Sequence, residues 1–320
     1  MKSFSRNLKS IFYGVALVVG TPAVGQSVET TIGPDGEEID IVTITQTEAA
    51  NYFIQATKNL NEKKGGKEKY ESFSQALTAE FTKLISKRLG EKYNLSEKYS
   101  KGIAFSMGKL YSLDYYSPYE FSPLNGMHTT TSNEMTEKLG VEFERRFCIA
   151  GQTDVLFSIR EWVEALNAWD EDNLPSFPRL KNTLKMSQYM QAFANAHERA
   201  HCYSPAEFNA EYIAAADMLR TAEDIDGVKN FLTLVMATRQ FGSTYAYKNF
   251  SDMGLAMFVH YKLERATYRA LYEYEQGVRY KNYNSILKAA KGINWEKEFL
   301  PGEQLKENAA YMKRLQGPRV

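Results

Sequence analysis

The chain has 320 residues, of which 43% are hydrophobic and 24% are charged, and its 39 basic side chains balance 39 acidic ones. This length can bury a sizeable hydrophobic core, and the balanced charge lacks the basic excess of nucleic-acid-binding proteins, so we expect no nucleic-acid partner. Beyond the N-terminal segment, no stretch of the sequence is long and apolar enough for a transmembrane helix.

The first 25 residues have the features of a secretory signal peptide. Lys2, Arg6 and Lys9 form a positive region, residues 11–20 are apolar, and Ala23 and Gly25 offer small side chains for cleavage. The apolar run is too short for a permanent transmembrane helix. We therefore expect a secreted or periplasmic mature chain from about residue 26, with no stable membrane insertion after cleavage. An uncleaved N-terminal membrane anchor is the alternative.

The rest of the chain is predicted to be mainly α-helical. Residues 38–46 alternate apolar and polar side chains and are rich in Ile, Val and Thr, which predicts one short strand. From residue 47 onward the apolar spacing is helical, and helices are predicted over 47–62, 68–90, 96–113, 132–148, 153–170, 182–202, 205–223, 228–240 and 253–280. We expect a single multi-helix domain over residues 26–320. An acidic, proline-containing stretch allows a domain boundary near 171–181.

The chain has two cysteines, Cys148 and Cys202. Because a signal peptide directs the chain to an oxidising compartment, the sequence favours a disulfide between them. Two buried free thiols remain the alternative.

The most specific pattern in the sequence is H-E-x-x-H at residues 197–201, within the predicted helix 182–202. Two of the four histidines of the chain, His197 and His201, are four residues apart and therefore share one helical face. Their imidazoles can converge on one Zn²⁺ ion, with Glu198 beside them to polarise a water molecule.

A third ligand is expected from the following helix. Ser204 and Glu207 have capping-box spacing, which would direct the Glu207 side chain back to the Ser204 amide. If the two helices fold back antiparallel around residue 204, Glu211 lies level with the imidazoles and is the predicted ligand. A wider helix crossing would favour Asp217 instead, since the two acidic residues point in different directions.

These residues resemble the gluzincin metallopeptidases. The resemblance covers residues 197–217 and includes the sequence Glu211-Tyr212-Ile213-Ala214 after the H-E-x-x-H motif. It implies a zincin-like motif helix, Zn²⁺ held by His197, His201 and Glu211, Glu198 as the general base, and a peptide or protein substrate. Asp217 is similar to the acidic residue that often closes the family's second helix motif. Arg199 and the longer Glu211–Asp217 spacing depart from the pattern.

Two expectations about the site and the fold remain. Peptide hydrolysis needs an electrophile for the oxyanion besides zinc, and His260 is a candidate, with Tyr203, Tyr261 and Tyr268 as alternatives. A single histidine on a helix is commonly a packing or surface residue. Zincin domains usually place a small sheet over the motif helix, and here residues 38–46 alone predict a strand. The rival function is that of a non-catalytic helical envelope or binding protein, in which the motif is incidental or structural.

Overall fold

The computed structural model describes residues 29–62, isolated positions between 76 and 91, 129–139, 146–152 with Asp154, 184–249 and 253–299. The predicted signal peptide, the predicted helix 96–113, the predicted helix 153–170 except Asp154, and the stretch 171–181 lie outside the described residues. Within the described ranges, no helix is both long enough and apolar enough to cross a membrane.

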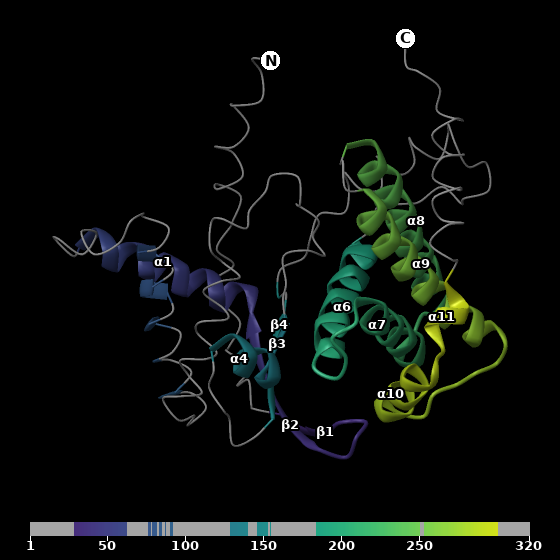
Figure 1. Cartoon of the computed structure of the whole chain (residues 1–320), viewed down its shortest axis with the longest axis horizontal. Helices are drawn as coiled ribbons and strands as arrows, with labels where there is room; N and C mark the ends of the chain where they lie inside the picture. Colours follow the sequence, from purple (N-terminus) through teal and green to yellow (C-terminus); the bar gives the residue numbers. More distant parts are fainter. Residues whose placement is uncertain are drawn as a thin grey trace, which may run out of the picture.

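Helices account for most of the described residues, as the sequence predicts (Figure 1). The strands are β1 (Glu29–Ile32), β2 (Glu38–Thr45), β3 (Thr129–Thr131) and β4 (Phe147–Gln152). The helices are α1 (Gln46–Glu62), α4 (Ser132–Leu139), α6 (Leu184–His201), α7 (Glu207–Thr221), α8 (Ile225–Asn249), α9 (Met253–Glu275), α10 (Tyr283–Gly292) and α11 (Trp295–Glu298).

The four strands form one sheet in the order β1-β2-β4-β3. Strand β2 runs antiparallel to β1 and parallel to β4, and β3 pairs antiparallel with β4, so that Thr129 lies opposite Ala150. β2 confirms the predicted strand, and its isoleucines Ile39, Ile41 and Ile44 are buried. β4 is buried along nearly its whole length, as expected of a central strand covered on both faces.

The predicted helix 132–148 is wrong over its last residues. α4 ends at Leu139, and Phe147 and Cys148 belong to strand β4. A short apolar run such as residues 147–150 fits a buried helix and a buried strand equally well by periodicity, and pairing with β2 selects the strand. The sheet therefore has four strands in the described residues, where the sequence predicts a single strand.

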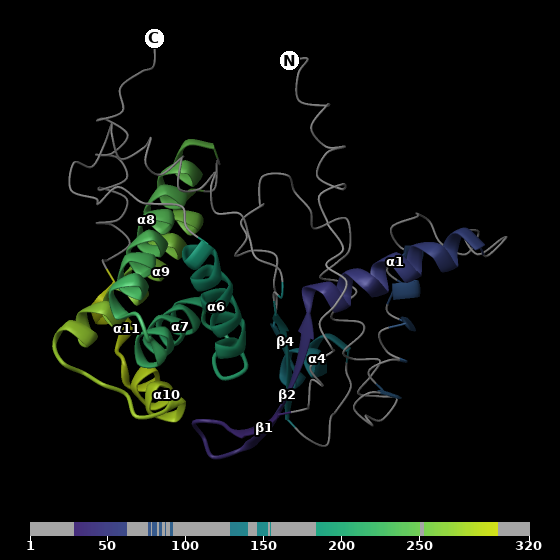
Figure 2. The same ribbon diagram turned by 180° about the vertical axis from the view of Figure 1, so that it is seen from behind.

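Helix α6 lies between the sheet and the helices α7 to α9 (Figures 1 and 2). On the helical side, Phe193 of α6 packs edge-on against Phe231 of α8, with ring centroids 5.8 Å apart. Nine of the fifteen residues of α7 are buried, and its alanines 214–216 allow the neighbouring helices to approach closely. α9 ends five residues before the predicted boundary, where Gly277 adopts a φ of 86° that stops a helix. On its other side, α6 contacts β3 and β4.

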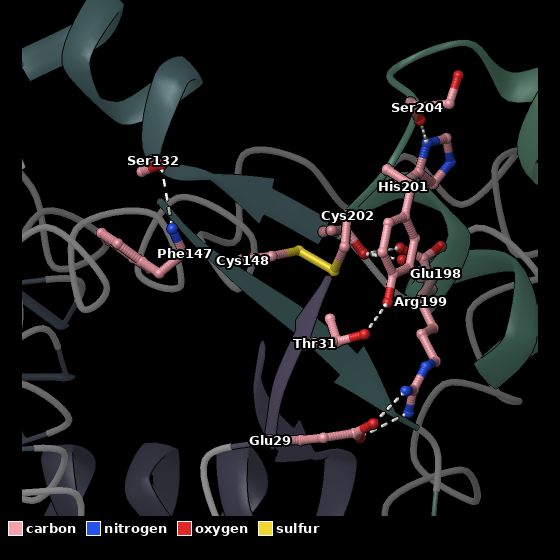
Figure 3. The surroundings of a disulfide bond; sticks show 12 residues. Glu29, Thr31, Ser132, Phe147, Cys148, Glu198, Arg199, His201, Cys202 and Ser204 are labelled. Atoms are coloured by element: carbon pink, nitrogen blue, oxygen red, sulfur yellow. Dashed lines mark hydrogen bonds and ion pairs between the residues drawn. A yellow bond between two sulfur atoms is a disulfide. The ribbon is translucent and has the colours of Figure 1, made fainter. Parts of the chain in front are cut away.

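A disulfide between Cys148 and Cys202 joins the sheet to the end of α6, which confirms the predicted pairing (Figure 3). The two Cα atoms are 5.4 Å apart, and both cysteines are buried beside Ile39 and Ile41 of β2. The bond ties a strand, rather than the predicted helix, to the residue that directly follows His201.

Removing this bond should destabilise the protein. The disulfide closes a loop between residues separated by 54 positions, and such a loop restricts the unfolded chain enough to contribute about 2–4 kcal/mol to the free energy of unfolding. Urea denaturation of the oxidised wild type and of the double variant Cys148→Ala, Cys202→Ala measures this difference. Equal unfolding midpoints for the two proteins would contradict the prediction.

Candidate metal centre

The site forms where α6 ends and the chain turns back into α7. The amides of Cys202 and Tyr203 donate hydrogen bonds to the carbonyls of Arg199 and Ala200, over 3.1 and 3.0 Å. These short-range bonds tighten the last turn of α6, and α7 begins soon afterwards at Glu207. The first turn of α7 therefore lies close to the two imidazoles of α6.

Three ligand atoms converge at this turn. The Nε2 atoms of His197 and His201 are 3.2 Å apart. One oxygen of Glu207, Oε2, lies 3.1 Å from the first Nε2 and 3.4 Å from the second. Two ligands about 2.0–2.1 Å from one tetrahedral Zn²⁺ are separated by about 3.3 Å, so the three observed distances fit a shared ion. The group formed by His197, His201 and Glu207 could therefore hold a metal.

The remaining nitrogen of each imidazole faces an acceptor of the protein. His201 Nδ1 lies 3.2 Å from the Ser204 carbonyl oxygen, as Figure 3 shows. His197 Nδ1 lies 3.0 Å from Glu211 Oε2, at ion-pair distance but without hydrogen-bond geometry. An acceptor at Nδ1 favours a proton there and leaves Nε2 for a metal, which is how the surroundings of metal-binding histidines usually orient them. The carbonyl of Ser204 acts on His201 in this way, whereas Glu211 acts on His197 through its charge.

The structure places Glu211 behind His197. Its carboxylate is fully buried and accepts two hydrogen bonds of 3.0 Å from the Nε and Nη2 atoms of Arg239 on α8. Burial alone would raise the pKa of Glu211, but the charges of Arg239 and His197 outweigh it and lower the pKa to about 2. Burial of His197 disfavours its charged imidazole, but the carboxylates of Glu207 and Glu211 favour it more strongly. The pKa of His197 therefore rises to about 9 when no metal is bound.

Glu207 takes the place in the group that the sequence assigns to Glu211. The predicted capping box is absent, because α7 begins at Glu207 and its N-cap residue is Ala206. The Glu207 carboxylate instead turns toward the histidines, and its hydrogen bonds with them lower its pKa despite partial burial. Its side chain is 58% exposed, so solvent reaches the group from this side.

Glu198 lies on the side of α6 that faces the sheet and is 5% exposed. The hydroxyl of Thr129 in β3 lies 2.8 Å from its Oε2 atom. The negative charge of Glu198 also acts on the imidazole of His197, where it favours the charged form. One oxygen of the motif carboxylate is thus held by the sheet, and its charge acts on one of the candidate ligands. Sequence reasoning missed Thr129, which is 69 residues away in the chain.

Arg199, the charged residue in the middle of the motif, is directed toward β1. Its Nη1 atom donates a hydrogen bond of 2.9 Å to Glu29 Oε2 (Figure 3). Its guanidinium carbon lies 5.8 Å from the Tyr283 ring centroid. Arg199 therefore fastens the motif helix to β1 and α10 and does not enter the metal group.

Of the two other predicted site residues, Asp217 is described by the structure and is not brought into the group. Asp217 accepts a hydrogen bond of 2.8 Å from the Nε atom of Arg220 on its own helix. His260 belongs to α9, but its side chain lies outside the described part of the structure. Comparisons of the chain with protein-family models, curated proteins and solved structures found no match.

Glu211 should strengthen metal binding through His197. In Glu211→Gln the acceptor remains but the charge is lost, and zinc affinity should fall by about 10–100-fold, as for other changes behind a metal ligand. Competition with a fluorescent zinc indicator measures the affinity. Asp217→Asn, an equivalent change on the same helix, is the control and should bind zinc like the wild type. Equal affinities for all three proteins would contradict the placement of Glu211.

The Glu211–Arg239 pair should also make the free energy of unfolding depend on pH. The pKa of Glu211 is lowered from its ordinary value of 4.5 to about 2 in the folded protein. The pair therefore stabilises the protein at pH values above 4.5, and this contribution is lost as the pH falls toward 2. With a chelator present, the free energy of unfolding of the wild type should fall more steeply from about pH 5 to about pH 3 than that of Glu211→Gln. Parallel curves from urea titrations would contradict this.

Proposed function

We propose that this protein is a secreted or periplasmic zinc-dependent metallopeptidase. The observation that carries the proposal is the convergence of His197 Nε2, His201 Nε2 and Glu207 Oε2 at mutual distances of 3.1–3.4 Å. The disulfide between Cys148 and Cys202 is compatible with an extracellular location and supports the expected secretion.

The donor set supports zinc as the metal. Two imidazole nitrogens and one carboxylate oxygen form a typical catalytic zinc ligand set, in which three protein ligands leave one position for water or substrate. Calcium and magnesium prefer sites made of oxygen atoms, which this group is not. The exposed side of Glu207 provides an approach from solvent to the open position.

The residues around this group can perform the steps of peptide hydrolysis. When bound, zinc supplies a Lewis acid that activates water and polarises the substrate carbonyl. Glu198 takes the proton of the attacking water and then gives it to the leaving amine. Glu211 and Arg239 keep His197 oriented for its role as a ligand. His260 stays our proposed donor to the oxyanion.

A non-catalytic helical envelope or binding protein is the second candidate function. The observation in its favour is the burial of Glu198, which is 5% exposed and whose carboxylate is held by Thr129. In such a protein a metal at this turn would fasten α7 to α6 and thereby stabilise the fold.

The presence of the site can be tested by elemental analysis of the purified mature protein. We expect close to one zinc per chain in the wild type and loss of the metal in His201→Ala, which removes one of three protein ligands. His128→Ala, the same substitution at a histidine outside the motif, is the matched control and should keep its zinc. A wild type without zinc after zinc has been supplied would rule out the site.

The two candidate functions differ in the effect of Glu198→Gln. For a peptidase, this variant should keep its zinc but cleave a fluorogenic peptide mixture at least about 100-fold more slowly, because the general base is lost. For a structural site, the zinc-loaded wild type would cleave no peptide of the mixture. That result would favour the non-catalytic protein.

A further inference from the structure

The hydroxyl of Thr129 contacts two oxygens of the same residue on α6. Its Oγ1 atom lies 2.7 Å from the backbone carbonyl oxygen of Glu198 and 2.8 Å from the carboxylate oxygen Oε2. Thr129 begins β3, so this contact links an edge of the sheet to the motif helix.

The backbone contact has a clear local cause. Glu198 is in the last turn of α6, where carbonyl groups lack the usual amide partner. The amide of Cys202, which would reach the Glu198 carbonyl in a continuing helix, donates instead to Arg199 over 3.1 Å. The hydroxyl of Thr129 satisfies this carbonyl and is thereby held beside the carboxylate.

The carboxylate contact distinguishes the two oxygens of Glu198. Oε2 accepts from Thr129, whereas Oε1 has no hydrogen-bond partner among the described residues. A threonine hydroxyl has a single proton, which the two nearby acceptors share. Glu198 is 5% exposed, so Oε2 would find little water to replace Thr129 if this contact were lost.

We propose that Thr129 is a positioning residue for the general base: it holds Glu198 Oε2 against the sheet, so that Oε1 is the oxygen that exchanges the proton with water and substrate. The inference rests on the proposed peptidase function. The proton taken from water resides on Oε1 until it passes to the leaving amine, and Thr129 undergoes no net proton change. Orientation of a catalytic group in this way contributes to rate without contributing to metal binding.

The disulfide on the strand beside Thr129 fits this role. In the register of β3 with β4, Thr129 lies opposite Ala150 and Thr131 lies opposite Cys148. Cys148 is bonded to Cys202, four residues after Glu198. The strand that supplies the hydroxyl is therefore paired with a strand that is covalently fixed to the end of the motif helix.

The test compares two substitutions at Thr129 in the zinc-loaded protein. Thr129→Val has the same shape but no hydroxyl, and should lower kcat about 10-fold while KM and zinc content stay unchanged. Thr129→Ser keeps the hydroxyl and should restore kcat to about the wild-type value. Crystal structures of both variants give a readout independent of turnover: the Glu198 carboxylate should move in Thr129→Val and stay in place in Thr129→Ser.

A matched control removes a similar hydrogen bond elsewhere in the sheet. Thr30 Oγ1 donates to Asp40 Oδ1 over 2.7 Å on the opposite edge strand, and Thr30→Val should leave kcat unchanged. If Thr129→Val does not fold, Thr129→Ala makes the same comparison with a smaller side chain.

The outcomes separate this inference from the proposed function. Wild-type kcat and an unmoved carboxylate in Thr129→Val would overturn the role of Thr129 while cleavage by the wild type upholds the peptidase. Equal losses in Thr129→Val and Thr129→Ser, or loss of zinc in either, would assign a structural role to Thr129 and also overturn it. A zinc-loaded wild type that cleaves nothing would overturn both proposals, and this failure is seen without any variant.

Discussion

The site depends on one buried charge interaction, the paired hydrogen bonds between Arg239 of α8 and Glu211 of α7. A carboxylate with no exposed surface is costly to bury unless a cation compensates it, and Arg239 does so with two parallel contacts. The compensated Glu211 then faces Nδ1 of His197, so that its Nε2 atom is directed toward His201 and Glu207. Three helices thus cooperate to orient a single imidazole.

The motif helix α6 receives support from two sides, and each side governs a different residue of the motif. The helices α7 and α8 hold His197 through Glu211 and Arg239. The sheet holds Glu198 through Thr129, and the disulfide fixes the sheet to the turn after His201. Since His197 and Glu198 are adjacent in sequence, their side chains diverge around the helix, and each needs its own neighbour.

The sequence alone predicts the features that depend on local spacing. It predicts the mainly α fold, the motif helix, strand β2 and the disulfide. It misses the short strands β1, β3 and β4, because three to six residues give little periodicity and their pairing is set by distant partners. The placement of Glu207 beside the histidines depends on where α7 begins, and a start at residue 207 rather than 205 redirects that side chain. The contact of Thr129 with Glu198 joins positions 69 residues apart and leaves no local pattern.

The central claim is that His197, His201 and Glu207 bind one zinc ion together, with Glu211 behind them. A crystal structure of the zinc-loaded wild type, with anomalous data at the zinc edge, tests this claim most directly. We predict one anomalous peak about 2.0–2.2 Å from both Nε2 atoms and from a Glu207 carboxylate oxygen. Absence of a peak between these atoms, or a zinc ion that binds Glu211 instead of Glu207, would contradict the account.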